Sequence, residues 1–555
     1  QVERERGITV KAQTVTMYHA HEGTDYVLNL IDTPGHVDFS YEVSRSLAAC
    51  EGVLLLVDAA QGIQAQTMAN YMLASRAGLT IVPVLNKIDL PGADVDRVAK
   101  QIEASFGIPA SECIAVSGKT GKGCEEVLRA VVERIPGPPS DREGDLQCLL
   151  FDTWFDGFRG VVCLVRVKRG TLKHGSRVKM MSTGTWYDVQ TVGAMHPEPV
   201  VSGVLYAGQV GFVMFANMKE PKEARVGDTM CGSDETEALP GFDPPVPMVF
   251  SGIYPIDASE YEALEKAMGK LTLNDSSVQL TKESSNALGM GFRCGFLGLL
   301  HMDVFRQRLE NEYEADVIVT TPTVPYKAYI DKKDETIIIS NPSYFPEPGT
   351  ASKFEEPIIE ATVITPTEYM GPIMELCKAR RGEQTDIEYL DWDQVLIKYI
   401  IPLNEVVLDF YDGLKGVSKG YASLDYSAGG YRPANVVLVE FQLNKSAVDA
   451  LSVIVHRDQA EYVARRTVER LKKALTRQQF EISIQAAIGS KIIASEKIQA
   501  FRKNVLMKGG KTVGGGDVSR KKKLLEKQKE GKKKMKRVGN VELSQDAFLS
   551  IIDGK

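Results

Sequence analysis

The sequence predicts a multidomain protein that combines α/β and β units. Its 555 residues correspond to about three to five domains of ordinary size. In the first quarter of the chain, apolar strand-like runs alternate with helix-like segments, which is typical of βαβ units. Residues 149–231 instead alternate apolar and polar residues between frequent glycines, and this pattern indicates a small β-barrel.

Residues 1–140 contain the predicted α/β domain. Its strand-like runs are 27–31, 53–57, 80–85 and 113–116, and its helix-like segments include 95–106 and 125–134. Parallel strands joined by helices leave loops at the carboxyl ends of the strands, where a ligand can bind. A proline-rich linker at 136–145 ends the domain.

Four further domains are predicted along the rest of the chain. They are a β-barrel at 146–238, α+β domains at 246–325 and 355–433 with a short polar connector between them, and a C-terminal α/β domain at 434–555. No apolar run approaches the roughly 18 residues that span a bilayer. The eight cysteines form no CxxC pair, and the histidines have no metal-ligand spacing, so no zinc site is predicted. We expect His301 to be a packed helix residue and Asp58 to close a strand.

The charge of the chain is divided unevenly. The net charge is −7, but residues 502–537 hold fifteen Lys or Arg and three acidic residues, so this segment carries +12 and the rest −19. A basic end on an acidic body predicts contact with a polyanion. The absence of aromatic residues between Arg502 and Ala547 favours phosphate contacts over base stacking. The alternatives are a solvated helix with local Glu–Lys pairs and contact with anionic lipid.

The segment IDTPGH, residues 31–36, has the residue types of a phosphate sensor. After a strand, Asp32 can hold a magnesium ion through water, and the Gly35 N–H can approach a phosphate oxygen. His36 can orient a water molecule for in-line attack on phosphorus. Taken alone, DxxPG also describes ordinary turns.

Two later segments, NKID at 86–89 and SGKTG at 117–121, have the residue types of a guanine site. Asp89 can accept hydrogen bonds from guanine N1 and N2, Asn86 can bond the ring edge, and the Lys87 stem can cover the base. A backbone N–H of the second segment can contact the guanine oxygen, with Lys119 packed nearby. Two such segments in order on one sheet favour a site over two unrelated turns.

The segment RGIT, residues 6–9, precedes these motifs. The Thr9 hydroxyl can ligate magnesium, and an ordered loop here can contact a terminal phosphate. A phosphate-binding loop G-x-x-x-x-G-K-[ST] is not completed, because Cys113 and Val505 stand where its first glycine is required. In a GTPase of linear motif order this loop precedes the others, so we expect it upstream of Gln1.

The motifs RGIT, DTPGH and NKxD, followed by a β-barrel, resemble those of the translational GTPases. Residues 291–313 and 356–382 resemble the third and fifth domains of elongation factor G, and the gap between them is too short for its fourth domain. The segment QAAIGSKIIASEKIQAFRKNV at 485–505 and the lysine-rich end resemble the C-terminal domain peculiar to the LepA family, also called elongation factor 4. This tail disfavours the BipA type of translational GTPase.

The resemblance implies a P-loop-type GTPase domain that is incomplete here, a translation-factor β-barrel, two ferredoxin-like α+β domains and a basic α/β C-terminal domain. It implies a ribosome-dependent GTPase that uses GTP and Mg²⁺ and contacts rRNA and tRNA. The family is proposed to move tRNAs back by one codon, while a role in initiation or ribosome assembly is an alternative. We expect a cytoplasmic monomer, with an organellar location or peripheral contact with the cytoplasmic face of the membrane as alternatives.

The resemblance also assigns roles to residues by motif match. His36 would act on the attacking water beside an apolar gate that includes Ile8. The nucleotide would be bound by Thr9, Asp32, Gly35, Asn86, Lys87, Ile88, Asp89, Ser117, Gly118 and Lys119, with Thr9 and Asp32 serving magnesium. RNA would be bound by Arg502, Lys503, Arg520, Lys521, Lys522, Lys523, Lys527, Lys532, Lys533 and Lys534. The alternative class is a non-hydrolysing ribosome- or RNA-binding fragment, because the chain as given lacks a phosphate anchor.

Overall fold

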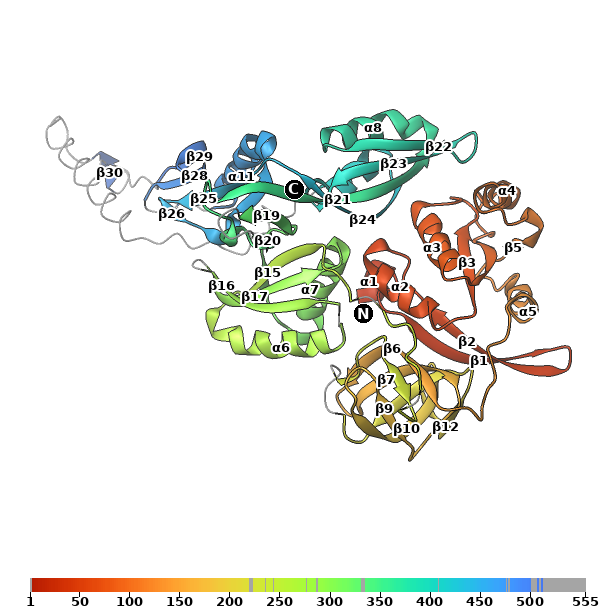
Figure 1. Ribbon diagram of the computed structural model, residues 1–555. Helices are drawn as coiled ribbons and strands as arrows, with labels where there is room; N and C mark the ends of the chain where they lie inside the picture. The colour runs from red at the N-terminus through yellow and green to blue at the C-terminus, as the bar shows by residue number, and fades with distance from the viewer. Residues whose placement is uncertain are drawn as a thin grey trace.

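The computed structural model describes most of the chain and orders it into five units (Figure 1). The described residues are 2–218, 223–234, 236–242, 244–275, 277–285, 288–330, 335–407, 409–475, 477, 480–500, 507–508 and 511–512. The predicted RNA-binding residues, from Arg502 to Lys534, lie outside these ranges. Within the described ranges, no helix is both long and apolar enough to cross a membrane.

The α/β unit is built on a parallel sheet with the strand order β3 (Gly52–Asp58), β4 (Thr80–Asn86) and β5 (Ile114–Ala115). The helices α2 (Ser40–Leu47), α3 (Ala65–Arg76), α4 (Val95–Phe106) and α5 (Cys124–Arg134) accompany these strands. Local signals explain the bounds of α4. The Asp94 side chain accepts the Arg97 N–H at its start, and Gly107 with a φ of +68° ends it. The prediction of parallel strands is confirmed for three of the four runs.

The prediction is wrong for the run 27–31. This run lies in β2 (Thr24–Asp32), which pairs antiparallel with β1 (Gln13–His21) and forms a separate two-stranded sheet. Glu22 and Gly23 join the two strands with φ angles of 48° and 79°. Two successive positive φ angles are typical of a type I′ turn, whose twist matches that of a hairpin. IDTPGH and NKID therefore follow strands of two different sheets.

The second unit is a closed antiparallel barrel. Its strands are β6 (Gln147–Asp156), β7 (Gly160–Arg169), β8 (Thr171–Lys173), β9 (Arg177–Met180), β10 (Trp186–His196), β11 (Glu198–Val201), β12 (Val204–Tyr206), β13 (Val210–Phe215) and β14 (Thr229–Cys231). The sheet runs β10-β13-β7-β6-β14-β9, and a β9–β10 pairing closes it. Val165, Val178 and Met230 fill its centre and are fully buried.

Two α+β units follow, and both have the element order β–α–β–β–α–β. The first contains β15 (Val249–Pro255), α6 (Tyr261–Leu273), β16 (Gln279–Ser285), β17 (Gly289–Phe296), α7 (Leu299–Tyr313) and β18 (Val317–Val319). The second contains β21 (Ala351–Pro366), α8 (Met370–Ala379), β22 (Glu383–Tyr389), β23 (Gln394–Pro402), α9 (Leu403–Val407), α10 (Phe410–Val417) and β24 (Ser423–Pro433). In each sheet the first strand lies between the third and the fourth.

The expectation of a polar connector between these units is wrong. The strands β19 (Tyr326–Ile330) and β20 (Glu335–Ile339) lie in that segment and pair with each other. β19 also pairs with residues 351–355 of β21, where β21 extends beyond its pairing with β24. β21 is long enough to offer its first residues as a pairing edge for β19. The sequence of β19 and β20 does not show that such an edge exists, so the sequence pattern did not predict the pairing.

The last described unit packs one helix on a small antiparallel sheet. Its strands are β25 (Val436–Leu443), β26 (Ser446–Ala447), β27 (Val453–His456), β28 (Ile482–Ile488) and β29 (Lys491–Ile498), and two short strands, β30 (Met507–Lys508) and β31 (Lys511–Thr512), follow. The helix is α11 (Ala460–Ala474). It buries Ala464, Val468 and Leu471, whose spacing of three and four residues places them on one face.

The α/β unit packs against the second α+β unit through a shared apolar core. Val57 and Ile102 belong to one cluster with Ile364, Leu390 and Leu396. In Figure 1, α3 and α4 accordingly face the end of the sheet that carries β22 and β23. The packing fixes the parallel sheet relative to a unit that lies far later in the chain.

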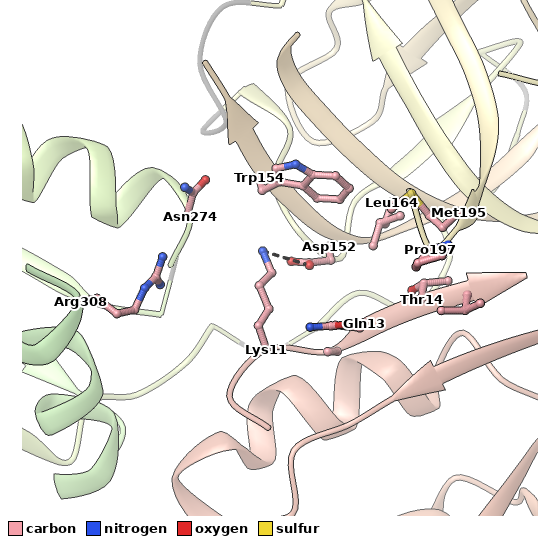
Figure 2. A pocket seen from close by; sticks show the side chains of 12 residues that line it. Lys11, Gln13, Thr14, Asp152, Trp154, Leu164, Met195, Pro197, Asn274 and Arg308 are labelled. Carbon is pink, nitrogen blue, oxygen red and sulfur yellow. Dashed lines mark ion pairs between the residues drawn. The ribbon is translucent and has the colours of Figure 1, made fainter. Parts of the chain in front are cut away.

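Three units meet at a cavity of about 330 Å³. Figure 2 shows Lys11 of the α/β unit reaching Asp152 of the barrel, where Nζ and Oδ2 lie 3.3 Å apart. Asn274 and Arg308 of the first α+β unit line the other side. Asn274 Oδ1 also accepts the N–H of Phe155 at 2.7 Å. The cavity therefore lies between the segment that follows RGIT, the barrel and the first α+β unit, and Lys11 ties that segment to the barrel.

A buried carboxylate stabilises the second α+β unit. Glu356 of β21 is 1% exposed and accepts two hydrogen bonds from Arg381 at 2.9 and 2.8 Å. It accepts a third from Arg432 of β24 at 3.0 Å. Removing one partner of a buried ion pair leaves uncompensated charge in a poorly solvated place, which is strongly destabilising.

Replacement of Glu356 by Gln should therefore destabilise the sheet by about 3 kcal/mol. Hydrogen exchange of the β21 and β24 amides in the intact chain measures this loss, because faster exchange reports a lower free energy for local unfolding of the sheet. The matched control is Asp386→Asn, because Asp386 pairs with Lys398 at 3.2 Å on the surface of the same sheet. Exposed pairs contribute about 1 kcal/mol or less. Equal losses in the two variants would contradict the role given to Glu356.

Candidate functional site

The RGIT segment forms a closed loop at the end of a short helix. Helix α1 (Val2–Arg6) ends at Gly7, whose φ is +67° and whose N–H bonds the carbonyl of Glu3 at 2.8 Å. The Glu3 carboxylate then accepts the N–H groups of Val10 at 2.8 Å and Lys11 at 3.2 Å. Glu3 thus holds both ends of the loop that carries Ile8 and Thr9, one through its backbone carbonyl and the other through its carboxylate, a role that sequence reasoning did not assign.

Thr9 and Asp32 come together across 23 residues. The Thr9 hydroxyl donates to Asp32 Oδ2 at 3.5 Å. Burial raises the pKa of Asp32, the Thr9 bond lowers it, and the charge of Glu3 raises it, with a net shift upward. A hydroxyl and a carboxylate are hard oxygen donors, and Mg²⁺ prefers such donors together with phosphate oxygens and water. The pair fits the predicted magnesium role.

The ring of His36 is fixed by its own turn. Its Nδ1 accepts the N–H of Asp38 at 3.2 Å, and it starts the 3₁₀ turn η1 (Val37–Phe39). Because Nδ1 accepts, the proton of the neutral ring is on Nε2, where it can donate to a water molecule. Gly35 is exposed, and a Cβ built on it would meet no atom within 4 Å. The space beside Gly35 is therefore open, and the His36 side chain is partly exposed. Ile8 is partly buried, and its gate role stays a prediction.

The NKID and SGKTG segments lock together at the carboxyl ends of β4 and β5. Asn86 Oδ1 accepts the N–H of Lys87 at 2.7 Å and that of Gly118 at 3.0 Å. Ser117 donates to Asp89 Oδ1 at 2.7 Å. This bond lowers the pKa of Asp89, so the carboxylate stays ionised and able to accept two guanine N–H groups. Ile88 supports the loop through its N–H, which bonds the carbonyl of Val116 at 3.3 Å.

Lys87 has a partner that the sequence did not reveal. Its φ is +66°, and its ammonium lies 2.8 Å from Asp58 Oδ2 at the end of β3. Burial raises the pKa of Asp58, but the bonds from Lys87 and from the N–H groups of Ala60 and Gln61 outweigh it and lower the pKa. Asp58 does end its strand, as expected, and it also orients the lysine. Lys119 is exposed.

The site thus consists of two clusters. One joins Thr9 to Asp32 with His36 following, and the other joins Asn86 and Asp89 to the loop at 117–118. Within the part of the chain that the structure describes, no group of three or more His, Cys, Asp or Glu could hold a metal ion. His301 is buried in α7, as expected, and its Nε2 lies 2.9 Å from Asp275 Oδ2 in a hydrogen bond.

Comparison with known families identifies four parts of the chain. The Elongation factor Tu GTP binding domain matches residues 1–137, and Elongation factor Tu domain 2 matches 160–231. The Elongation factor G C-terminus matches 353–440, and the GTP-binding protein LepA C-terminus matches 443–553.

Several relatives are similar over the whole of this chain. "Translation factor GUF1, mitochondrial" of Homo sapiens is 52% identical over 100% of this chain and 83% of the relative. "Translation factor GUF1 homolog, mitochondrial" of Sorghum bicolor is 54% identical over 100% and 84%, and "Elongation factor 4" of Geobacillus thermodenitrificans is 51% identical over 100% and 90%. A crystal structure of a Thermus thermophilus protein shares the fold with a TM-score of 0.54 and 17% identity, over 78% of this chain and 90% of that one.

The motifs and the matched domains define a translational GTPase, an enzyme that hydrolyses GTP. The chain belongs to the family of elongation factor 4, or LepA, and the mitochondrial translation factor GUF1. The predicted family and the predicted function as a translational GTPase are confirmed, and the non-hydrolysing alternative is not favoured.

The bonds of Asn86 generate a prediction for nucleotide binding. Asn86→Ala removes the acceptor that ties the 117–118 loop to β4, so the affinity for GDP and GTP should fall about tenfold, as expected for one or two lost hydrogen bonds. Fluorescence titration with a labelled guanine nucleotide measures this. Asn444→Ala is the matched control, since Asn444 accepts the Ser483 N–H at 2.9 Å far along the chain. Unchanged affinity in the Asn86 variant would contradict the guanine role of this cluster.

Proposed function

We propose that the protein hydrolyses GTP on the ribosome, with His36 orienting the attacking water, and that it uses this hydrolysis to move tRNAs back by one codon. The observation that carries the catalytic part is the His36 ring, which is partly exposed, is held at Nδ1 by the Asp38 N–H and follows Gly35, where the space is open. Membership of a family of translation factors supports the ribosomal partner.

The proposed roles follow from the chemistry of phosphoryl transfer. This reaction asks the protein chiefly for positioning and for stabilisation of charge on phosphate oxygens. Magnesium, when bound with GTP, would neutralise part of that charge, and Thr9 and Asp32 would hold it. Asp89 and Asn86 would orient the guanine, and His36 Nε2 would hold the water in line. Ile8 would form part of the apolar gate past which the His36 ring moves toward the water.

Such a site can stay slow until a partner completes it, because His36 acts only when it points at the water. The ribosome is that partner in our proposal. Bound GTP would favour the ordered state of residues 6–9, and loss of the terminal phosphate would release it. A role in initiation or in ribosome assembly is the second candidate, since it would use the same hydrolysis and the same basic tail.

The finer architecture is also proposed. The β–α–β–β–α–β order of both α+β units supports ferredoxin-like folds, and the closed barrel supports a translation-factor type of second domain. We keep the domain bounds 1–140, 146–238, 246–325, 355–433 and 434–555 as proposals, with β19 and β20 added to the fourth unit. We also propose a monomer. An organellar or bacterial location is proposed from the names and organisms of the relatives, among which mitochondrial and bacterial factors occur.

His36→Ala should lower ribosome-stimulated GTP hydrolysis about a hundredfold, while nucleotide affinity stays nearly unchanged, because the ring acts on water and not on the nucleotide. Phosphate release by the protein, expressed with whatever coding sequence precedes Gln1, measures the rate with and without ribosomes.

The chain provides a matched control in His456. This residue starts a 3₁₀ turn in the same way, with its Nδ1 accepting the Asp458 N–H at 3.4 Å, but it lies in the C-terminal unit. His456→Ala should leave the stimulated rate within about twofold. Equal loss of rate in both variants, or loss of nucleotide binding in the His36 variant, would contradict the catalytic role. Absence of any stimulation in the wild type would contradict the ribosomal function itself.

The basic tail is proposed to contact rRNA or tRNA phosphates. Neutralisation of phosphates by Lys and Arg releases counterions, so the affinity for RNA should fall steeply as salt rises. Deletion of residues 520–537 should flatten this dependence, measured by ribosome binding across a salt series. An unchanged slope would favour a solvated helix, and equal binding to anionic vesicles would favour a lipid partner.

A further inference from the structure

Asp38 follows His36 by two residues, and the roles described above leave it unused. It is 4% exposed in the turn η1. Its Oδ2 accepts the backbone N–H of Leu300 at 2.7 Å and that of His301 at 3.2 Å. Its Oδ1 accepts the Tyr426 hydroxyl at 3.0 Å. One buried carboxylate therefore joins the α/β unit to both α+β units.

The first of these contacts caps α7 from another unit. The first N–H groups of a helix have no partner within it, and a side-chain oxygen normally satisfies them from the preceding residue. In α7 that residue is Gly298, which has no side chain, and Asp38 takes its place from 262 residues away. A negative charge at a helix N-terminus is also favoured by the helix dipole.

A glycine is required at position 298 because the Asp38 carboxylate comes so close to it, and not because of its backbone conformation. Its φ of −172° is ordinary extended geometry that any residue adopts. A Cβ built on it, however, would overlap the Asp38 carboxylate. The structure therefore uses a glycine here to admit a side chain from a distant part of the chain.

Apolar contacts hold the same turn in place. Phe39 clusters with Val2 of α1 and Val304 of α7, and its ring meets the edge of His301 at a centroid distance of 5.9 Å. Arg6 of the RGIT segment donates to Gln307 of α7 at 2.6 Å. Helix α7 thus contacts both elements that flank the proposed reaction centre.

We propose that Asp38 is a positioning residue that couples the arrangement of the two α+β units to His36. Its backbone N–H holds His36 Nδ1, while its side chain holds α7 and β24. If α7 or β24 moves relative to the α/β unit, the turn must follow or these bonds must break. A partner that rearranges the α+β units would thereby reset the His36 ring. The inference deepens the proposed function and rests on it for the identity of that partner.

The first test compares substitutions of Asp38 in ribosome-stimulated GTP hydrolysis. Asp38→Ala should lower kcat at least tenfold, while the ribosome concentration at half-maximal rate and the nucleotide affinity change less than twofold. Asp38→Asn should restore most of the rate, because its side-chain oxygen can still accept the two α7 N–H groups. A fall in affinity with unchanged kcat, or an Asn variant as slow as Ala, would overturn the proposal.

The second test changes residues of the α+β units that contact the Asp38 carboxylate. Tyr426→Phe removes only the hydroxyl, and Gly298→Ala displaces the carboxylate without changing it, so each should lower kcat about three- to tenfold. Combined with Asp38→Ala, neither should lower it further, because the bond is already lost. Tyr329→Phe is the matched control, since its hydroxyl donates to Glu355 at 2.8 Å in the sheet that contains β24. Additive effects, or an equal effect of the control, would overturn the proposal.

Hydrogen exchange provides a readout without ribosomes. In the intact chain, the amides of Leu300 and His301 should exchange at least tenfold faster in Asp38→Ala, and also faster in Tyr426→Phe, while those of α11 are unchanged. Unchanged exchange at α7 in both variants would overturn the coupling. If ribosomes fail to stimulate the wild type while this exchange result holds, the proposed ribosomal function fails and the coupling stands.

Discussion

The loops of the site depend on one physical constraint, that backbone N–H groups at the ends of helices and strands need acceptors. In this chain, side-chain oxygens and one ring nitrogen supply them across loops. Glu3 holds the loop after α1, Asp58 holds the turn after β3, and Asn86 holds the loop after β5. His36 and Asp38 extend the pattern to the turn η1 and to α7. Each acceptor fixes backbone that would otherwise bond water, so the loops are shaped before any ligand arrives.

The residues of the site could be predicted where a short segment contains the whole signal. DTPGH, NKID and SGKTG each carry their chemistry in a few adjacent residues, and the structure places Thr9 beside Asp32 and Asp89 beside Ser117. The partners of these residues could not be predicted. Glu3, Asp58 and Asp38 are ordinary acids in sequence, and their function is defined by N–H groups or ammonium groups that only the fold brings near.

The coarse fold was predictable for the same reason, and its errors have a common cause. The parallel strands and the barrel follow from local periodicity and turn residues. The run 27–31 was assigned to the wrong sheet, because its partner β1 is selected by the two-residue turn at Glu22 and Gly23. The strands β19 and β20 were missed, because β19 pairs with the extended first part of β21. Strand pairing is a relation between segments, and a single segment shows it only weakly.

Hydrogen bonds suit the coupling of distant units better than apolar contacts do. An apolar interface such as the one that joins Ile102 to Leu396 tolerates small sliding, because dispersion and burial depend weakly on direction. A buried carboxylate that accepts three hydrogen bonds tolerates little, since the bonds weaken steeply with angle and unpaired buried groups are costly. The three bonds of Asp38 therefore favour one defined arrangement of the turn, which α7 or β24 can leave only by breaking them or by moving the turn. The shared apolar core joins the α/β unit to the second α+β unit without these bonds, so the contacts of Asp38 can change while those two units stay together.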